Sequence, residues 1–175
     1  MIARFAAAAG ALLLAACAAL PPTEPAFPSL TAVPASFEMT GRLAVREGDR
    51  SEIAQLRWTR RGRTDTWVIA SPLGNEVARI ESTPSGATLT QGGGEPEEAP
   101  SFEALTRRAL GVALDPDWLA QCLHGEAPAH LPDGWRFRID ETQPAGAIRL
   151  AKRITVRKDD TVVRLVVDSY RALGD

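Results

Sequence analysis

Cysteine and histidine are scarce in this chain of 175 residues. There are two of each, Cys17 and Cys122, and His124 and His130. Two histidines and so few thiols do not by themselves build a closed zinc site of ordinary composition. We therefore expect no metal or other cofactor. We also expect the domain to be stabilised by the packing of its side chains.

Positive charge is not in excess, and long apolar runs are absent. The 20 basic and 22 acidic residues give a net charge of −2. No basic patch emerges from such a balance, so nucleic acid is not an expected partner. The longest apolar run, Phe5 to Ala16, has roughly 12 residues, whereas a membrane-spanning helix needs about 20.

Residue patterns typical of enzymes are missing as well. Ser71 is not part of a G-x-S-x-G motif and neither histidine lies near it in the sequence. The run Gly92-Gly93-Gly94 lacks the lysine of a phosphate loop. We expect His124 and His130 in solvated or helix-capping roles, and Cys122 as a small buried hydrophobe on a helical stripe. The sequence thus predicts a protein that is not an enzyme.

The N-terminus has the three parts of a secretory signal. Arg4 precedes the apolar run, which ends in Leu14-Ala15-Ala16 directly before Cys17. This pattern resembles a bacterial lipobox, in which the cysteine is acylated, for example with palmitate, and becomes the new N-terminus. The alternatives are an ordinary signal peptide with a chance cysteine, or a buried apolar helix. Ala18, where an aspartate would favour retention at the inner membrane, favours the outer membrane.

Three segments follow from this interpretation. Residues 1–16 are the expected signal peptide, and residues 17–35 are the acylated cysteine and a tether rich in proline. Residues 36–175 are one domain, with a length that suits a single core. Removal of Arg4 with the signal leaves 19 basic and 22 acidic residues, or −3. With Cys17 acylated, only Cys122 remains and no intramolecular disulfide can form.

The domain is predicted to be α+β, with an antiparallel sheet and helices on one side. Alternating polar and apolar residues predict strands. A solvated loop is expected over residues 91–100, and a helix after Ser101 as N-cap. A second short helix opens at Asp115-Pro116. The expected strands are 37–46, 52–60, 64–70, 76–82, 87–90, 135–140, 147–157 and 161–170.

The inner faces of these strands carry large apolar residues, which could form a packed core or an apolar cavity; periodicity alone does not separate the two. Leu73, between Pro72 and Gly74, is a large apolar residue where turns normally carry polar ones. Either it folds back onto the core, or it protrudes into a bilayer or a partner. Full burial of such a side chain is worth about 1.5–3 kcal/mol.

The order and spacing of several short motifs resemble the LolB family of outer-membrane lipoproteins. The motifs are Gly41-Arg42-Leu43-Ala44-Val45-Arg46, Trp58, Ser71-Pro72-Leu73-Gly74, Leu119 with Leu123-His124-Gly125, and Gly134-Trp135. The resemblance covers nearly the whole mature chain. It implies an unclosed antiparallel β-barrel with a short helical lid over an apolar cavity that takes acyl chains.

The resemblance also implies partners and roles. The chain would accept acylated lipoproteins from a LolA-like periplasmic carrier and insert them into the outer membrane, as a lipid-anchored monomer on the periplasmic face. Transfer would run down an affinity gradient, without ATP, a cofactor or a covalent step. Pro72, Leu73 and Gly74 would form the membrane insertion loop. The implied acyl-chain cavity comprises Phe37, Leu43, Leu56, Trp58, Trp67, Leu105, Trp118, Leu119, Cys122, Trp135 and Phe137.

The sequence departs from the family in some places. Cys122 stands where a lid tryptophan is common, and Tyr170 where the closing strand often has tryptophan. A late proline-bearing loop is trimmed to residues 142–146. The alternative hypothesis is a membrane-tethered lipoprotein that binds another amphiphile or acts as a protein-interaction module. A soluble LolA-like carrier is a third, and acylation of Cys17 would exclude it.

Overall fold

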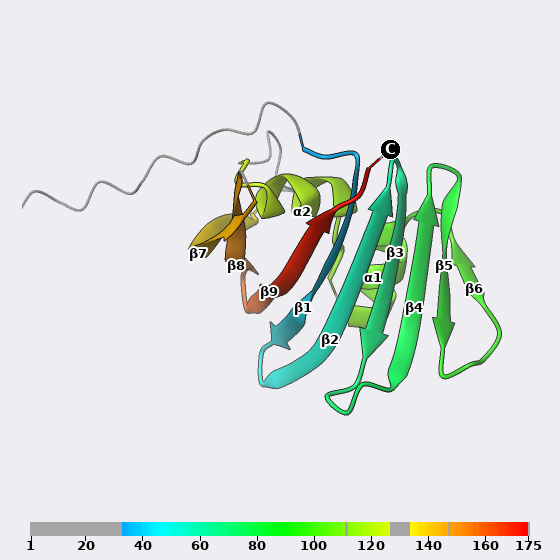
Figure 1. Cartoon of the computed structure of the whole chain (residues 1–175). Helices are drawn as coiled ribbons and strands as arrows, with labels where there is room; N and C mark the ends of the chain where they lie inside the picture. Colours follow the sequence, from blue (N-terminus) through cyan, green and yellow to red (C-terminus); the bar gives the residue numbers. More distant parts are fainter. Residues whose placement is uncertain (1–32, 111, 127–133, 147, 175) are drawn as a thin grey trace, which may run out of the picture.

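Nine antiparallel strands form one curved sheet with two short helices against one face (Figure 1). This computed structural model describes residues 33–110, 112–126, 134–146 and 148–174. The signal peptide, Cys17, most of the tether and His130 lie outside the described residues. The strands are β1 (Ser36–Glu47), β2 (Arg50–Arg61), β3 (Thr64–Ala70), β4 (Glu76–Thr83), β5 (Gly86–Gln91), β6 (Glu97–Ala99), β7 (Arg136–Ala145), β8 (Ile148–Lys158) and β9 (Thr161–Ala172).

The strand order is β6-β5-β4-β3-β2-β1-β9-β8-β7, which confirms the predicted α+β antiparallel class. The last strand, β9, returns to pair with the first, so the two ends of the domain are joined at the middle of the sheet. The outermost strands β6 and β7 are the two ends of this order, and the sheet is therefore an unclosed barrel. Among the described residues no helix has the length and apolarity needed to cross a membrane.

Both helices start at the predicted caps. In α1 (Phe102–Leu110) the hydroxyl of Ser101 accepts a hydrogen bond from the Ala104 N–H at 3.3 Å. In α2 (Pro116–Leu123) the Asp115 carboxylate accepts from the backbone N–H groups of Asp117 and Trp118. Helix α1 packs on β4, β5 and β6, whereas α2 packs on β8. The two helices thus cover separate halves of the inner face.

Two sequence-based expectations were wrong. Residues 97–99, expected within a solvated loop, form the edge strand β6 and pair with β5. Such a strand needs only one partner, and the charges of Glu97 and Glu98 discourage further pairing. Strand β7 continues to Ala145, through the residues read as a trimmed loop, after register shifts beside Glu141. Pro144 is tolerated there because β7 is an edge strand.

The first and last strands approach each other unusually closely at Gly41. The β1–β9 register shifts between Thr40 and Gly41. A Cβ atom on Gly41 would lie 2.2 Å from the carbonyl oxygen of Val166, which is too close for a side-chain atom to fit. Glycine is therefore required at this position by the approach of a neighbouring backbone.

Candidate functional site

The residues predicted to line an apolar interior do come together. They belong to one cluster between the inner face of the sheet and the two helices. Most are buried, while Trp135 and Phe137 are partly buried and pack against the rest. The buried members are Phe37, Leu43, Leu56, Trp58, Trp67, Leu105, Trp118, Leu119 and Cys122.

A row of aromatic rings crosses this interior from strand to helix. Ring centroids are 4.9 Å apart for Phe37 and Trp58, 5.4 Å for Trp58 and Trp67, and 4.8 Å for Trp67 and Phe102. The row thus runs from β1 through β2 and β3 to α1. The indole N–H groups of Trp67 and Trp118 are buried and have no hydrogen-bond partner among the described residues. A buried donor without an acceptor costs about 1–3 kcal/mol, so these two groups are open to an acceptor that enters the interior.

An ionic cluster that sequence reasoning missed lies at the edge of this interior. The Arg60 guanidinium donates to both carboxylate oxygens of Asp65, at 3.0 and 2.9 Å. It also bridges to Asp117 in the first turn of α2. The Trp58 indole N–H donates to Asp65 at 2.6 Å. Burial opposes the charge of Arg60, but the two carboxylates outweigh it and hold its pKa above the ordinary value.

The arginine therefore joins the β2–β3 hairpin to α2 through one buried charge. A signal for it exists in the sequence. Asp65 stands two residues before Trp67 and shares its inward phase, so its carboxylate enters the interior and requires a cation.

His124, expected to be solvated or capping, is the C-cap of α2 and is buried. Its Nδ1 lies 2.7 Å from the carbonyl oxygen of Ala120, which can only accept, so Nδ1 carries the proton. The other nitrogen, Nε2, then accepts from the Tyr170 hydroxyl at 2.8 Å. Burial lowers the pKa of His124 and raises that of Tyr170 to about 12. The solvated alternative is thus wrong, because the imidazole links α2 to β9.

The loop between β3 and β4 is a tight, hydrogen-bonded turn. The Ser71 N–H donates to the Asn75 carbonyl, and the Gly74 N–H donates to the Ser71 carbonyl, both at 2.8 Å. Gly74 has φ +89°, which favours glycine, and the Gln55 side-chain amide donates to the Pro72 carbonyl at 3.1 Å. Leu73 is 89% exposed. The side chain therefore does not fold back onto the core.

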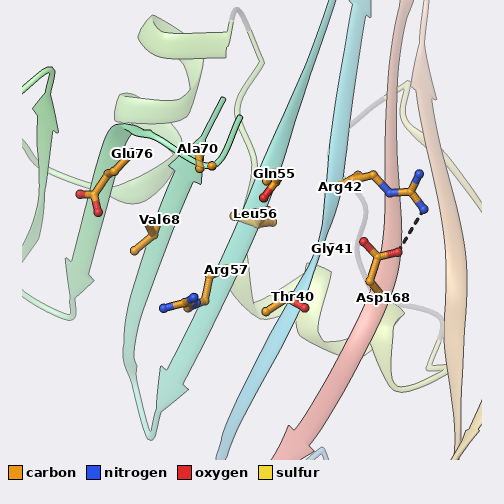
Figure 2. A pocket seen from close by; sticks show the side chains of 11 residues that line it. Thr40, Gly41, Arg42, Gln55, Leu56, Arg57, Val68, Ala70, Glu76 and Asp168 are labelled. Atoms are coloured by element: carbon orange, nitrogen blue, oxygen red, sulfur yellow. Dashed lines mark hydrogen bonds and ion pairs between the residues drawn. The ribbon is translucent and has the colours of Figure 1, made fainter. Parts of the chain in front are cut away.

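Two pockets flank this loop on opposite sides of the sheet. One, of about 360 Å³, is mostly apolar and includes the buried side chains Leu43, Val45 and Ile69, with Ser71 at the base of the loop. The other, of about 460 Å³, lies on the outer face and is mostly polar (Figure 2). Its wall includes Arg42, which pairs with Asp168 at 3.0 Å. The apolar pocket is therefore continuous with the interior, whereas the polar one is not.

Comparison with known proteins identifies relatives of this chain. A family model described as "Outer membrane lipoprotein LolB" matches residues 35–170. The relatives named "Outer-membrane lipoprotein LolB" from Cupriavidus metallidurans and Cupriavidus necator are 35% and 34% identical, in each case over 90% of both chains. That from Azoarcus sp. is 29% identical over 98% of this chain and 96% of its own.

A solved structure, that of the LolA superfamily protein NE2245 from Nitrosomonas europaea, aligns with a TM-score of 0.44 at 9% identity. The alignment covers 85% of this chain and 89% of that one. The matched family residues include both helices and all nine strands except the last two residues of β9. Because the family model matches most of the chain and two relatives exceed 30% identity over 90% of it, the chain belongs to the LolB family of outer-membrane lipoproteins.

Proposed function

We propose that this chain accepts acylated lipoproteins from a LolA-like periplasmic carrier and inserts them into the outer membrane. Its own Cys17, acylated after removal of residues 1–16, anchors it to the periplasmic face. The observation that carries the proposal is the exposed Leu73 on a fixed turn beside the mouth of an apolar interior. Membership of the LolB family supports the same function.

The interior would receive the acyl chains of the cargo. Its residues are apolar and aromatic and lie between the sheet and two helices that are short enough to move as units. An entering chain replaces contacts that these side chains make with one another, so acceptance requires α1 or α2 to shift from the sheet. The indole N–H groups of Trp67 and Trp118 would donate to the carbonyl oxygens of an acyl ester.

Transfer of this kind needs no covalent step and no nucleotide. Each methylene group removed from water contributes about 0.8 kcal/mol, so an acyl chain moves from a weaker to a stronger apolar site and finally into the bilayer. The described residues include no cluster of three or more metal-ligating side chains. The chain's own part is therefore to shelter acyl groups and to deliver them where Leu73 meets the membrane.

Acceptance is tested by mixing a purified carrier, loaded with an acylated lipoprotein, with this chain carrying Cys17→Ala. The proposal predicts that cargo co-purifies with the chain without added nucleotide. A non-acylated form of the cargo is the control and should stay unbound. Cargo that remains on the carrier while both proteins are folded would contradict the proposal. It would favour the alternative of a tethered module that binds another amphiphile or a protein.

A further inference from the structure

The exposed apolar side chains of the described residues are gathered at one end of the sheet. The large hydrophobic residues that are exposed there are Leu73, Ile53 and Val77, at 89%, 63% and 43%. They come from three segments: the β3–β4 loop, the start of β2 and the start of β4. Single exposed apolar residues are ordinary, whereas a cluster of them on one surface can mark an interaction site.

Hydrogen bonds and strand pairing fix how these segments meet. The β2–β3 pairing ends at Gln55 and Ala70, and the Gln55 side chain holds the Pro72 carbonyl at 3.1 Å. Ile53 therefore lies at the side of the loop, two residues beyond the last pair. Ala70 is also paired with Glu76, so that Val77 lies on the opposite side. Leu73 is thus in the β3–β4 loop, with Ile53 on one side of it and Val77 on the other. This loop lies at the lower end of the sheet in Figure 1.

Ile53 and Val77 also border the apolar pocket of about 360 Å³ whose deeper wall includes the buried residues Leu43 and Ile69. The exposed apolar edge is in this way continuous with the interior cluster. The lining of this pocket is mostly apolar, with Glu52 and Ser71 as its polar members, and Ser71 leads into the turn that carries Leu73.

We propose that Ile53, Leu73 and Val77 together form a membrane-contacting edge, and that its occupant is the acyl layer of the outer membrane. This inference rests on the proposed function and extends its membrane contact from one residue to three. In it, Ile53 and Val77 hold the mouth of the apolar pocket against the bilayer while Leu73 enters it.

A bilayer fits this edge better than a protein does. A protein interface commonly buries about 800 Å² on each partner around a packed apolar centre, which three side chains at a strand end do not provide. Each of the three can enter a fluid acyl layer independently, with a gain in proportion to its buried apolar area. The fixed turn around Leu73 also presents its side chain without further ordering.

The test is depth-dependent fluorescence quenching on the complete acylated chain in phosphatidylethanolamine–phosphatidylglycerol vesicles. Ile53, Leu73 and Val77 are replaced singly by Cys and labelled with an environment-sensitive dye. Ser85→Cys, in the β4–β5 turn at the other end of the sheet, is the matched control. Cys122 is buried and burial raises the pKa of its thiol to about 12, so labelling is confined to the introduced residue.

With quenchers attached to the lipid acyl chains, the proposal predicts quenching at 53 and 77 at least half as strong as at 73, and none at 85. Quenching at 73 alone would overturn the three-residue edge and leave the proposed function standing. No quenching at any position would overturn both. Quenching at all three positions in a chain that accepts no cargo would support the edge and contradict the proposed function.

A second measurement concerns delivery. Ile53→Glu combined with Val77→Glu should lower the rate of cargo insertion into these vesicles about tenfold, with acceptance from the carrier unchanged. Ser85→Glu should leave both steps unchanged. Insertion by the double variant at the unaltered rate would refute the edge. Loss of acceptance as well would also refute it, because the residues would then serve the interior and not the membrane.

Discussion

Replacement of Asp65 by Asn should destabilise the domain far more than replacement of Asp117, although both carboxylates bind the same guanidinium. Arg60 is only 7% exposed and Asp65 is buried beside it, so water cannot replace the lost charge. Asp117 has a side chain that is 73% exposed and is solvated already. The two substitutions therefore separate a buried ion pair from an exposed one around one cation.

The magnitudes follow from these exposures. Removal of one partner of a buried pair costs about 3–5 kcal/mol. Asparagine keeps an oxygen that can accept from the Trp58 N–H, so the lower end, about 3 kcal/mol, is expected for Asp65→Asn. An exposed pair contributes about 0–1 kcal/mol. Loss of a negative charge in the first turn of α2 adds a few tenths, and Asp117→Asn should therefore cost about 1 kcal/mol.

Urea unfolding followed by circular dichroism measures these differences, since Trp58 is itself part of the cluster and would disturb a fluorescence signal. Asp168→Asn breaks the exposed pair with Arg42 and is the matched control, with an expected loss below about 1 kcal/mol. Arg60→Met combined with Asp65→Asn should recover part of the stability, because no charge is then left buried. Equal losses for Asp65→Asn and Asp117→Asn, or no recovery in the double variant, would refute this reasoning.

Three further predictions concern the rest of the interior. Tyr170→Phe removes the donor to His124 Nε2 and should cost about 1 kcal/mol in the same urea assay; an unchanged midpoint would contradict the hydrogen bond. Burial lowers the pKa of His124, so the unfolded chain binds a proton at this imidazole more readily than the folded chain does. The free energy of unfolding should therefore be highest above about pH 6.5 and should fall as the pH drops below that value. His124→Gln should flatten that part of the profile, and an equally steep profile in the variant would argue against this assignment. Gly41→Ala forces a Cβ atom against the Val166 carbonyl and should cost about 2 kcal/mol, whereas Gly174→Ala, with no atom within 4 Å, should cost nothing; equal effects would contradict the close approach.

Much of the sheet could be predicted because its strands have one buried and one exposed face. In β3 the buried residues Asp65, Trp67 and Ile69 alternate with half-buried ones, and β1 and β9 show the same period. The short strand β6 could not be found this way, since Glu97 and Glu98 carry no apolar alternation. Its strand conformation comes from pairing with β5, which is a tertiary interaction.

Some residues of the site could be predicted from the sequence and others could not. The apolar members of the interior follow from alternation and helical spacing. The sequence also places Leu73 in a turn, but it leaves open whether the side chain folds back onto the core, and only the structure shows it exposed. The burial of Arg60 does not follow from its neighbours, because Arg61, Gly62 and Arg63 suggest an exposed hairpin end. Its second carboxylate partner, Asp117, is distant in the sequence and reaches the arginine only when α2 packs on the sheet.

Acceptance and delivery can be separated by following one cargo through two steps. A loaded carrier is mixed with the chain, and vesicles are then added, for the unaltered sequence, for Leu73→Glu and for Asn75→Glu as a control of charge on the same turn. We expect that all three accept cargo and that Leu73→Glu alone fails to pass it to the vesicles. Insertion by Leu73→Glu at the unaltered rate, or failure of acceptance in the unaltered chain, would contradict this expectation.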